Sequence, residues 1–336
     1  MDRAASPEIE LVASSARLEA LRSEWEALWQ RTPGANPFQS PAWLLPWWQV
    51  FGNDRLRTLA FREQGRLTGL LPLYLLEEGG IRKLLPLGIG NTDRLDPLLI
   101  PVQAALALEW LAAQPHEFDR FDLEDQAEDS PLLGAPAPPA WADETHACAP
   151  RPVLLLPRDA ADMRSAVPRL GKLAYYRRRA ARLGEAVLEL ATSSTLTDHL
   201  ESLFRLHAAR WAGRGGPGVL ADPRVQAFHR LAAPQLLAAG LLRCRALRVD
   251  GRIVAVLYAL ADGGTAYAYL AGYDPDLHHP GLGALVIGHA IEQTAAEGLR
   301  TFDFLRGREP YKYDWGAVDR PTFGRSLRPP AQGRRK

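Results

Sequence analysis

The residues with the most evident capacity for chemistry form the polar and aromatic run Arg306-Gly-Arg-Glu-Pro-Tyr-Lys-Tyr-Asp-Trp315. Lys312 stands between two tyrosines in this run, and a lysine held there can bind a phosphate or stabilise a developing oxyanion. Glu309 and the nearby Asp303 are carboxylates that can orient the lysine or accept a proton. The alternative is a surface lysine whose stem lies along the aromatic rings.

The segments that precede this run predict an anion site. Thr265–Tyr273 alternates like a strand, and the turn His278–Gly283 leads into a helical repeat of apolar residues over Ala284–Ala295. Free N–H groups and the helix dipole converge where a glycine-containing turn starts a helix, so an anion is stabilised there. The next predicted strand, Arg300–Leu305, places the polar run beside that turn, at the mouth of an open α/β sheet.

Two basic segments are further candidates. His207 and Arg210 share a helix face ahead of the glycine-rich run Gly213–Gly218, which can close over a substrate. Arg210 can clamp a carboxylate or phosphate, or it can form an ion pair at the helix end. The helix Arg169–Arg182 carries a basic face that can bind an anionic polymer such as tRNA, or can simply be solvated.

Composition excludes several classes of protein. The chain has 336 residues, 47% of them hydrophobic and 24% charged, with a formal net charge of +1. This balance is typical of a globular protein of about two domains and does not favour DNA binding. Cys148 and Cys244 are isolated, so neither a disulfide framework nor a metal site is expected. We find no signal-peptide or membrane-spanning pattern, which indicates a cytoplasmic protein.

The sequence also contains a faint internal repeat. Gly65–Leu73 is similar to Gly251–Ala259, and Arg120–Asp125 is similar to Thr301–Arg306. Between these pairs each half has a predicted strand and helix: Leu95–Ile100 then Ala104–Ala113, and Thr265–Tyr273 then Leu282–Glu297. Duplicated domains explain the repeat, and chance similarity of two hairpins is the alternative.

The domain boundaries follow from the proline-rich segment Pro131–Pro157 between the halves. We predict an N-terminal domain over residues 8–150, a C-terminal domain over residues 151–328 and a disordered basic tail over residues 329–336.

Four motifs together resemble a known family. They are Asn36-Pro-Phe-Gln-Ser-Pro-Ala-Trp43, His207-Ala-Ala-Arg-Trp211, Tyr273 with the later Pro280-Gly-Leu, and Phe302–Gly316. The last is the most specific. They resemble the FemAB-like branch of the GNAT acyltransferases, in particular the CelD-like acetyltransferases of cellulose biosynthesis. The resemblance implies an α/β fold with two tandem GNAT-like domains, each a mixed sheet flanked by helices.

The resemblance also implies direct transfer of an acyl group from acyl-CoA, with acetyl-CoA expected and no metal. The acceptor would be an amine or hydroxyl of a sugar, a polysaccharide or a cell-envelope precursor. The resemblance places the CoA pyrophosphate on the turn, although the usual leading basic residue is missing there. The implied cofactor-binding residues are Gly272, Pro280, Gly281, Leu282 and Gly283.

Roles in the reaction follow in the same way. A backbone N–H from a bulged strand near Ala271 or Gly272 can stabilise the oxyanion, and Tyr273 or Tyr311 can protonate the leaving thiolate. FemAB-type enzymes carry a similar active-site lysine, which points to Lys312. The turn histidines His278 and His279 are candidate bases, and the substrate-binding candidates are His207, Arg210, Trp211 and Arg306.

Two alternatives remain open. A FemAB-type peptidyltransferase would take its group from aminoacyl-tRNA, and the basic helix favours it mildly. A non-catalytic scaffold in an exopolysaccharide complex would instead have Lys312 or Arg210 buried in structural pairs.

Overall fold

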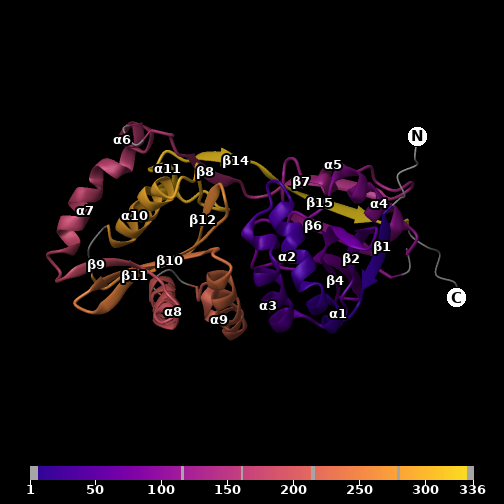
Figure 1. Cartoon of the computed structure of the whole chain (residues 1–336), viewed down its shortest axis with the longest axis horizontal. Helices are drawn as coiled ribbons and strands as arrows, with labels where there is room; N and C mark the ends of the chain where they lie inside the picture. Colours follow the sequence, from indigo (N-terminus) through magenta and orange to yellow (C-terminus); the bar gives the residue numbers. More distant parts are fainter. Residues whose placement is uncertain (1–6, 115–116, 160–161, 213–215, 278–280, 331–336) are drawn as a thin grey trace. The chain divides into compact units, whose positions relative to one another are not determined.

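The computed structural model describes residues 7–114, 117–159, 162–212, 216–277 and 281–330, and the chain divides into two compact units (Figure 1). The first unit comprises the residues up to Ala149 together with those from Pro321 onward, and the second is Pro150–Arg320. The predicted fold class, a mixed α/β chain with two sheet-centred parts, is confirmed. None of the helices in these described ranges is long and apolar enough to cross a membrane.

The first unit contains two sheets. One has the strand order β1-β2-β3, and the other has five strands in the order β4-β5-β6-β15-β7. Its strands are β1 (Glu8–Val12), β2 (Thr58–Glu63), β3 (Arg66–Leu71), β4 (Leu73–Glu78), β5 (Ile81–Pro86), β6 (Arg120–Ala127), β7 (Ala142–Ala147) and β15 (Thr322–Arg328). Its helices are α1 (Ser15–Ala20), α2 (Arg22–Arg31), α3 (Pro41–Phe51), α4 (Pro101–Ala112) and α5 (Pro131–Gly134).

Aromatic residues build much of the core of this unit. Trp25 and Trp43 are fully buried, and each indole N–H is satisfied: Trp25 donates to the Gln39 carbonyl at 2.9 Å and Trp43 to Thr92 Oγ1 at 2.8 Å. A buried tryptophan requires such a partner because an unpaired indole N–H is costly. These rings are therefore core residues.

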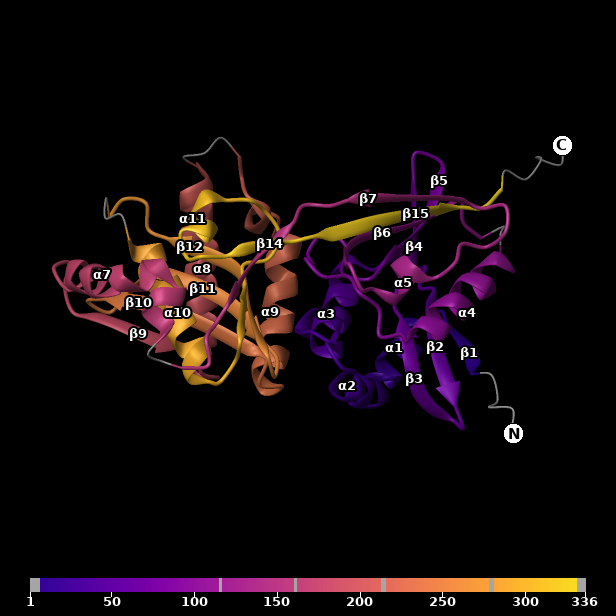
Figure 2. The ribbon, with the colours of Figure 1, turned by 90° about the horizontal axis from the view of Figure 1, so that it is seen from above.

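The end of the chain returns to the first unit, which corrects the predicted domain boundary at residue 328. Strand β15 pairs with β6 on one side and β7 on the other, as Figure 2 shows. Arg325 secures it through the carboxylate of Asp143 at 2.8 Å and the carbonyl of Ala135 at 2.8 Å. Without β15, the facing edges of β6 and β7 would be left unpaired. The second unit therefore ends at Arg320, and most of the predicted tail lies outside the described residues.

The second unit has one seven-stranded mixed sheet in the order β14-β8-β13-β12-β11-β10-β9. Its strands are β8 (Arg151–Leu155), β9 (Ala186–Leu190), β10 (Leu242–Val249), β11 (Arg252–Ala261), β12 (Thr265–Tyr273), β13 (Thr301–Asp303) and β14 (Val318–Arg320). Its helices are α6 (Met163–Ala166), α7 (Leu173–Ala180), α8 (Leu196–Ala212), α9 (Pro223–Ala238), α10 (Leu282–Ala296) and α11 (Pro310–Tyr313). Helices α10 and α7 cover one face of the sheet, and α8 and α9 cover the other (Figure 1).

The two units share part of their topology. Hairpins β2–β3 and β10–β11 both turn through a non-glycine residue of positive φ followed by glycine, Gln64-Gly65 and Asp250-Gly251. In each unit a helix then separates two parallel strands, α4 between β5 and β6 and α10 between β12 and β13. The predicted strand Leu95–Ile100 is wrong, because this segment makes only an isolated bridge at Leu98. Strand β5 takes that place instead.

Candidate active site

The centre of the second unit's sheet is splayed. Parallel strands β12 and β13 pair only where Thr265–Tyr267 faces Thr301–Asp303, because β13 ends at Asp303. Within the described chain, β12 then continues to Tyr273 with no strand on that side. Backbone groups along this edge are therefore open to a ligand.

A β-bulge interrupts β12 beside the splay. Leu270 pairs with Tyr258 and Ala268 with Ala259, so Tyr269 is the extra residue. We predicted a bulge near Ala271 or Gly272. This predicted position is wrong, because both residues pair in regular register with β11. A bulge redirects a strand and leaves a residue unpaired in the ladder, so it is suited to aim an N–H at a bound group.

The N-terminus of α10 lies next to the end of β12. Gly281 has φ +133° and precedes the helix, and a Cβ there would come within 2.5 Å of the Tyr176 ring. A Cβ on Gly283 would come within 3.1 Å of the Tyr273 ring. Because these glycines have no side chains, the rings of Tyr176 and Tyr273 can lie directly against the start of the helix. The N–H groups of the first helical turn are suited to bind an anion there. Leu282 is buried, and Pro280, His278 and His279 lie outside the described residues.

Three predicted site residues meet near this helix start. The Arg210 guanidinium stacks over the Tyr273 ring at 4.9 Å, and both groups act electrostatically on Tyr311. Burial raises the pKa of Tyr311 to about 12, and the nearby Glu309 carboxylate adds to this rise. The Tyr311 phenol is therefore protonated at neutral pH and can donate a proton.

His207 and Trp211 extend this cluster along α8. Burial, aided by the Arg210 charge, lowers the pKa of His207 to about 4, so the imidazole is neutral at pH 7. Its ring lies 5.9 Å from the Trp211 ring, centroid to centroid. His207 Nδ1 and Arg210 Nε are buried with no hydrogen-bond partner in the described part of the chain. A buried polar atom without a hydrogen-bond partner destabilises the fold, unless a ligand or a water molecule supplies the partner.

Gly272 explains how α8 reaches this position. A Cβ at Gly272 would lie 2.9 Å from Leu206 Cβ and 3.0 Å from the His207 backbone nitrogen. The glycine therefore allows α8 to pack closely on β12, which brings Arg210 to the Tyr273 end of the strand. The side of Gly272 that would carry a Cβ faces α8, and its contact with the cofactor stays a prediction.

Lys312 and Asp303 face inward. Lys312 is 3% exposed, and its ammonium donates to the carbonyls of Leu305, Arg306 and Gly307 at 3.1, 2.8 and 3.1 Å and pairs with Glu309 at 2.9 Å. Asp303 pairs with Arg151, and its Oδ1 accepts the Leu305 N–H at 2.8 Å. The Lys312 donors are thus directed at a loop in which Leu305 has φ +58° and Gly307 φ +106°. Arg306 is exposed on the same loop.

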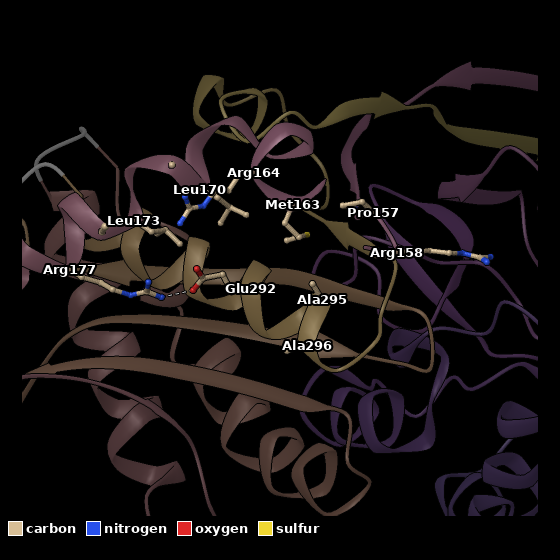
Figure 3. A pocket seen from close by; sticks show the side chains of 12 residues that line it. Pro157, Arg158, Met163, Arg164, Leu170, Leu173, Arg177, Glu292, Ala295 and Ala296 are labelled. Atoms are coloured by element: carbon tan, nitrogen blue, oxygen red, sulfur yellow. Dashed lines mark hydrogen bonds and ion pairs between the residues drawn. The ribbon is translucent and has the colours of Figure 1, made fainter. Parts of the chain in front are cut away.

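A cavity of about 520 Å³ lies elsewhere in this unit, against the last turns of α10 (Figure 3). Leu170, Leu173 and Ala295 are among its apolar lining residues, and Arg177 pairs with Glu292 at its edge. Part of the predicted basic helix lines it, including Arg177. None of the residues gathered around Tyr311 does, so the cavity is separate from that cluster.

Comparisons with known proteins place this region in a family. Residues 169–313 match the family described as "Acetyltransferase (GNAT) domain", and they include all the elements around the splay. A mycothiol acetyltransferase of Clavibacter michiganensis is 32% identical over 114 residues, which is 34% of this chain and 36% of that protein. The chain thus spans about a third of that relative's length. Both comparisons therefore find similarity to acetyltransferases, over part of the chain only.

Solved structures share the fold over nearly the whole chain. FemX has a TM-score of 0.66 at 10% identity and covers 95% of this chain and 96% of its own. The C-terminal domain of a putative lysylphosphatidylglycerol synthetase from Agrobacterium fabrum has a TM-score of 0.60 at 12% identity, covering 93% and 92%. At these identities the likeness concerns the fold alone.

Proposed function

We propose that the protein transfers an acyl group from acyl-CoA, with acetyl-CoA as the expected donor, because residues 169–313 match the GNAT acetyltransferase domain. The proposed acceptor is an amine or hydroxyl of a sugar, a polysaccharide or a cell-envelope precursor. The observation that carries the proposal is the free edge of β12 beyond Tyr267, which leads to the N-terminus of α10.

The donor would bind along these two elements. The amide groups of pantetheine can pair with the open backbone of β12 as a short added strand, because this edge has no neighbour on the β13 side. The pyrophosphate would rest on the N–H groups of Gly281, Leu282 and Gly283, where the helix dipole favours negative charge. No basic side chain of that turn is required for this contact.

The reaction would proceed by direct attack. The acceptor nitrogen or oxygen attacks the thioester carbonyl carbon while Glu309, more than half exposed, takes its proton. An N–H of the bulged segment at Tyr269 stabilises the oxyanion. When the intermediate collapses, the C–S bond breaks and the CoA sulfur takes the proton of Tyr311. Tyr311 carries that proton at neutral pH.

The remaining predicted residues would position these groups. Arg210 can bind an anionic group of the acceptor while it stacks on Tyr273, and neutral His207 and Trp211 support it from the same helix. Lys312 would hold the Leu305–Gly307 loop beneath Tyr311, and Asp303 would fix the end of β13 through Arg151. Neither would contact the reacting atoms.

A FemAB-type transfer from aminoacyl-tRNA is the second candidate. Its support is the basic segment around α7, where Lys172, Arg178 and Arg182 are exposed. However, Arg177 pairs with Glu292 and nearby Arg169 with Asp314, which neutralises part of that face. The burial of Lys312 among carbonyls suits the scaffold alternative, whereas the unpartnered Nε of Arg210 in the described chain suits a ligand site.

Calorimetric titration with acetyl-CoA tests the proposal. We expect a Kd between about 1 μM and 1 mM, the usual range for an enzyme substrate, and binding at least about tenfold weaker in Gly281→Glu. The matched control is Gly298→Glu, which also replaces a positive-φ glycine (φ +83°) but at the other end of α10, with nothing within 4 Å of its Cβ. If the wild type does not bind, the donor assignment is wrong. If Gly281→Glu binds like the wild type, the placement of the pyrophosphate on this turn is wrong.

A further inference from the structure

Three potential metal ligands meet on the five-stranded sheet of the first unit. Glu124 lies on β6, His146 lies on β7, and Cys148 follows directly after β7. His146 and Cys148 are two residues apart in extended chain, so their side chains leave the same face. The Cys148 N–H donates to the Thr322 carbonyl at 2.9 Å, which continues the pairing of β7 with β15.

A glycine on the intervening strand brings the three side chains together. Strand β15 separates β6 from β7, and adjacent strands lie about 4.8 Å apart. Gly324 of β15 is paired with His146, and a Cβ there would come within 2.3 Å of His146 Nε2 and 3.0 Å of a Glu124 carboxylate oxygen. The missing side chain at Gly324 therefore leaves the space in which Glu124 and His146 meet.

Two of the three distances between the ligand atoms match those around a tetrahedral ion. Glu124 Oε2 lies 3.4 Å from His146 Nε2 and 3.2 Å from Cys148 Sγ, and all three ligand atoms are within 4.8 Å of one another. Tetrahedral zinc, with bonds of about 2.0 Å to nitrogen and oxygen and about 2.3 Å to sulfur, holds its ligand atoms about 3.3–3.6 Å apart. Only small side-chain movements would close this set around an ion.

We propose that Glu124, His146 and Cys148 form a Zn²⁺ site, although the sequence analysis expected no metal. One sulfur, one nitrogen and one oxygen ligand favour zinc, because magnesium and calcium prefer oxygen ligands alone. The Glu124 and His146 side chains are 39% and 46% exposed, so an ion can enter from solvent and keep a water as its fourth ligand. Cys148 binds as the thiolate, and its proton passes to solvent.

The ion would hold the C-terminal strand β15 in place by cross-linking the strands on either side of it. It would link β6 to β7 over Gly324, and so hold β15 in the sheet from the face on which Glu124 and His146 lie. This role is independent of acyl transfer, because all three ligands belong to the first unit while the candidate active site belongs to the second.

The test uses the untagged full chain after removal of metal. Zn²⁺ is titrated in competition with a chromophoric chelator, and Co²⁺ is used separately as a spectroscopic probe of thiolate ligation. We expect one equivalent of zinc, a cobalt–thiolate charge-transfer band and a rise in the unfolding temperature. Cys148→Ser and His146→Ala should each weaken zinc binding at least about tenfold. The control Cys244→Ser, which changes the buried cysteine of the second unit, should not.

A Gly324→Ala variant tests the geometry itself, because the added methyl occupies the space between Glu124 and His146. It should weaken zinc binding while leaving all three ligands in the chain. The site assignment is overturned if the wild type fails to compete with the chelator. It is also overturned if Cys148→Ser or His146→Ala binds like the wild type, or if cobalt gives no thiolate band. Circular dichroism of each variant separates loss of metal from loss of fold.

Discussion

Replacement of Lys312 by methionine is the change whose effect can be derived most directly from the structure. Methionine keeps an unbranched stem and removes the ammonium, so the carbonyls of Leu305, Arg306 and Gly307 lose their donor. A buried acceptor left without a partner costs about 1–3 kcal/mol. The ion pair with Glu309 adds little, because that carboxylate is more than half exposed.

The expected loss is about 3–5 kcal/mol of the free energy of unfolding, because one buried carbonyl and two partly buried ones lose their donor together. It is less than the sum of three full penalties, because the Arg306 and Gly307 carbonyls are only partly buried. The methionine also avoids the desolvation of a buried cation. The loop carries two positive φ angles, at Leu305 and Gly307, and would lose the cation that holds it in this conformation.

Urea unfolding followed by circular dichroism measures the loss, and hydrogen exchange of the amides in residues 304–316 localises it. Lys172→Met is the matched control, since it removes an exposed lysine from the same unit and should change stability by less than about 0.5 kcal/mol. A Lys312→Met protein that unfolds like the wild type, yet has lost its acyl transfer, would refute the structural role and restore Lys312 as a catalytic residue.

Three further predictions concern the second unit. Tyr311→Phe should lower kcat roughly 10²–10⁴-fold, because the variant has no proton to donate. The wild-type rate should fall only as the pH approaches the Tyr311 pKa of about 12. An unchanged kcat in the variant would exclude Tyr311 as the acid. Burial lowers the pKa of His229 to about 3, so folding stability should be lost as pH falls from about 6.5 to 3, by up to about 1.4 kcal/mol per pH unit. Urea midpoints of His229→Phe should be less sensitive to acid, and equal slopes would contradict this. Gly272→Ala should cost about 1–3 kcal/mol in urea unfolding, because its methyl would lie 2.9 Å from Leu206 Cβ; a neutral effect would show that α8 can shift freely.

Local patterns in the sequence were sufficient to predict the strand and the helix around the candidate site. The alternation over Thr265–Tyr273 predicted β12 with the bounds that the structure has, and the apolar repeat that follows predicted α10. Both signals arise from the period of a single strand or helix, which depends only on residues close in sequence. The bulge at Tyr269 was misplaced because it depends on the register with β11, which local periodicity does not specify.

The predicted domain boundary failed for a similar reason. Thr322–Arg328 directly follows the second unit in the sequence, and nothing in its own residues indicates which sheet it joins. Its place is decided by the edges of β6 and β7, whose residues lie far back in the chain. The proline-rich segment marked the change of unit near residue 150 but could not show that the chain returns.

The sequence by itself determined the kinds of residue available and the elements that carry them, because hydrogen bonding within a helix and alternation along a strand are local. Tertiary structure alone decided which side chains meet. It paired Asp303 with Arg151 across 152 residues, turned Lys312 inward onto three carbonyls, and placed Glu124 beside His146 over a glycine of the C-terminal strand. Such partners are selected when the whole unit packs and each buried charge must find its counterpart, and no local pattern encodes that choice.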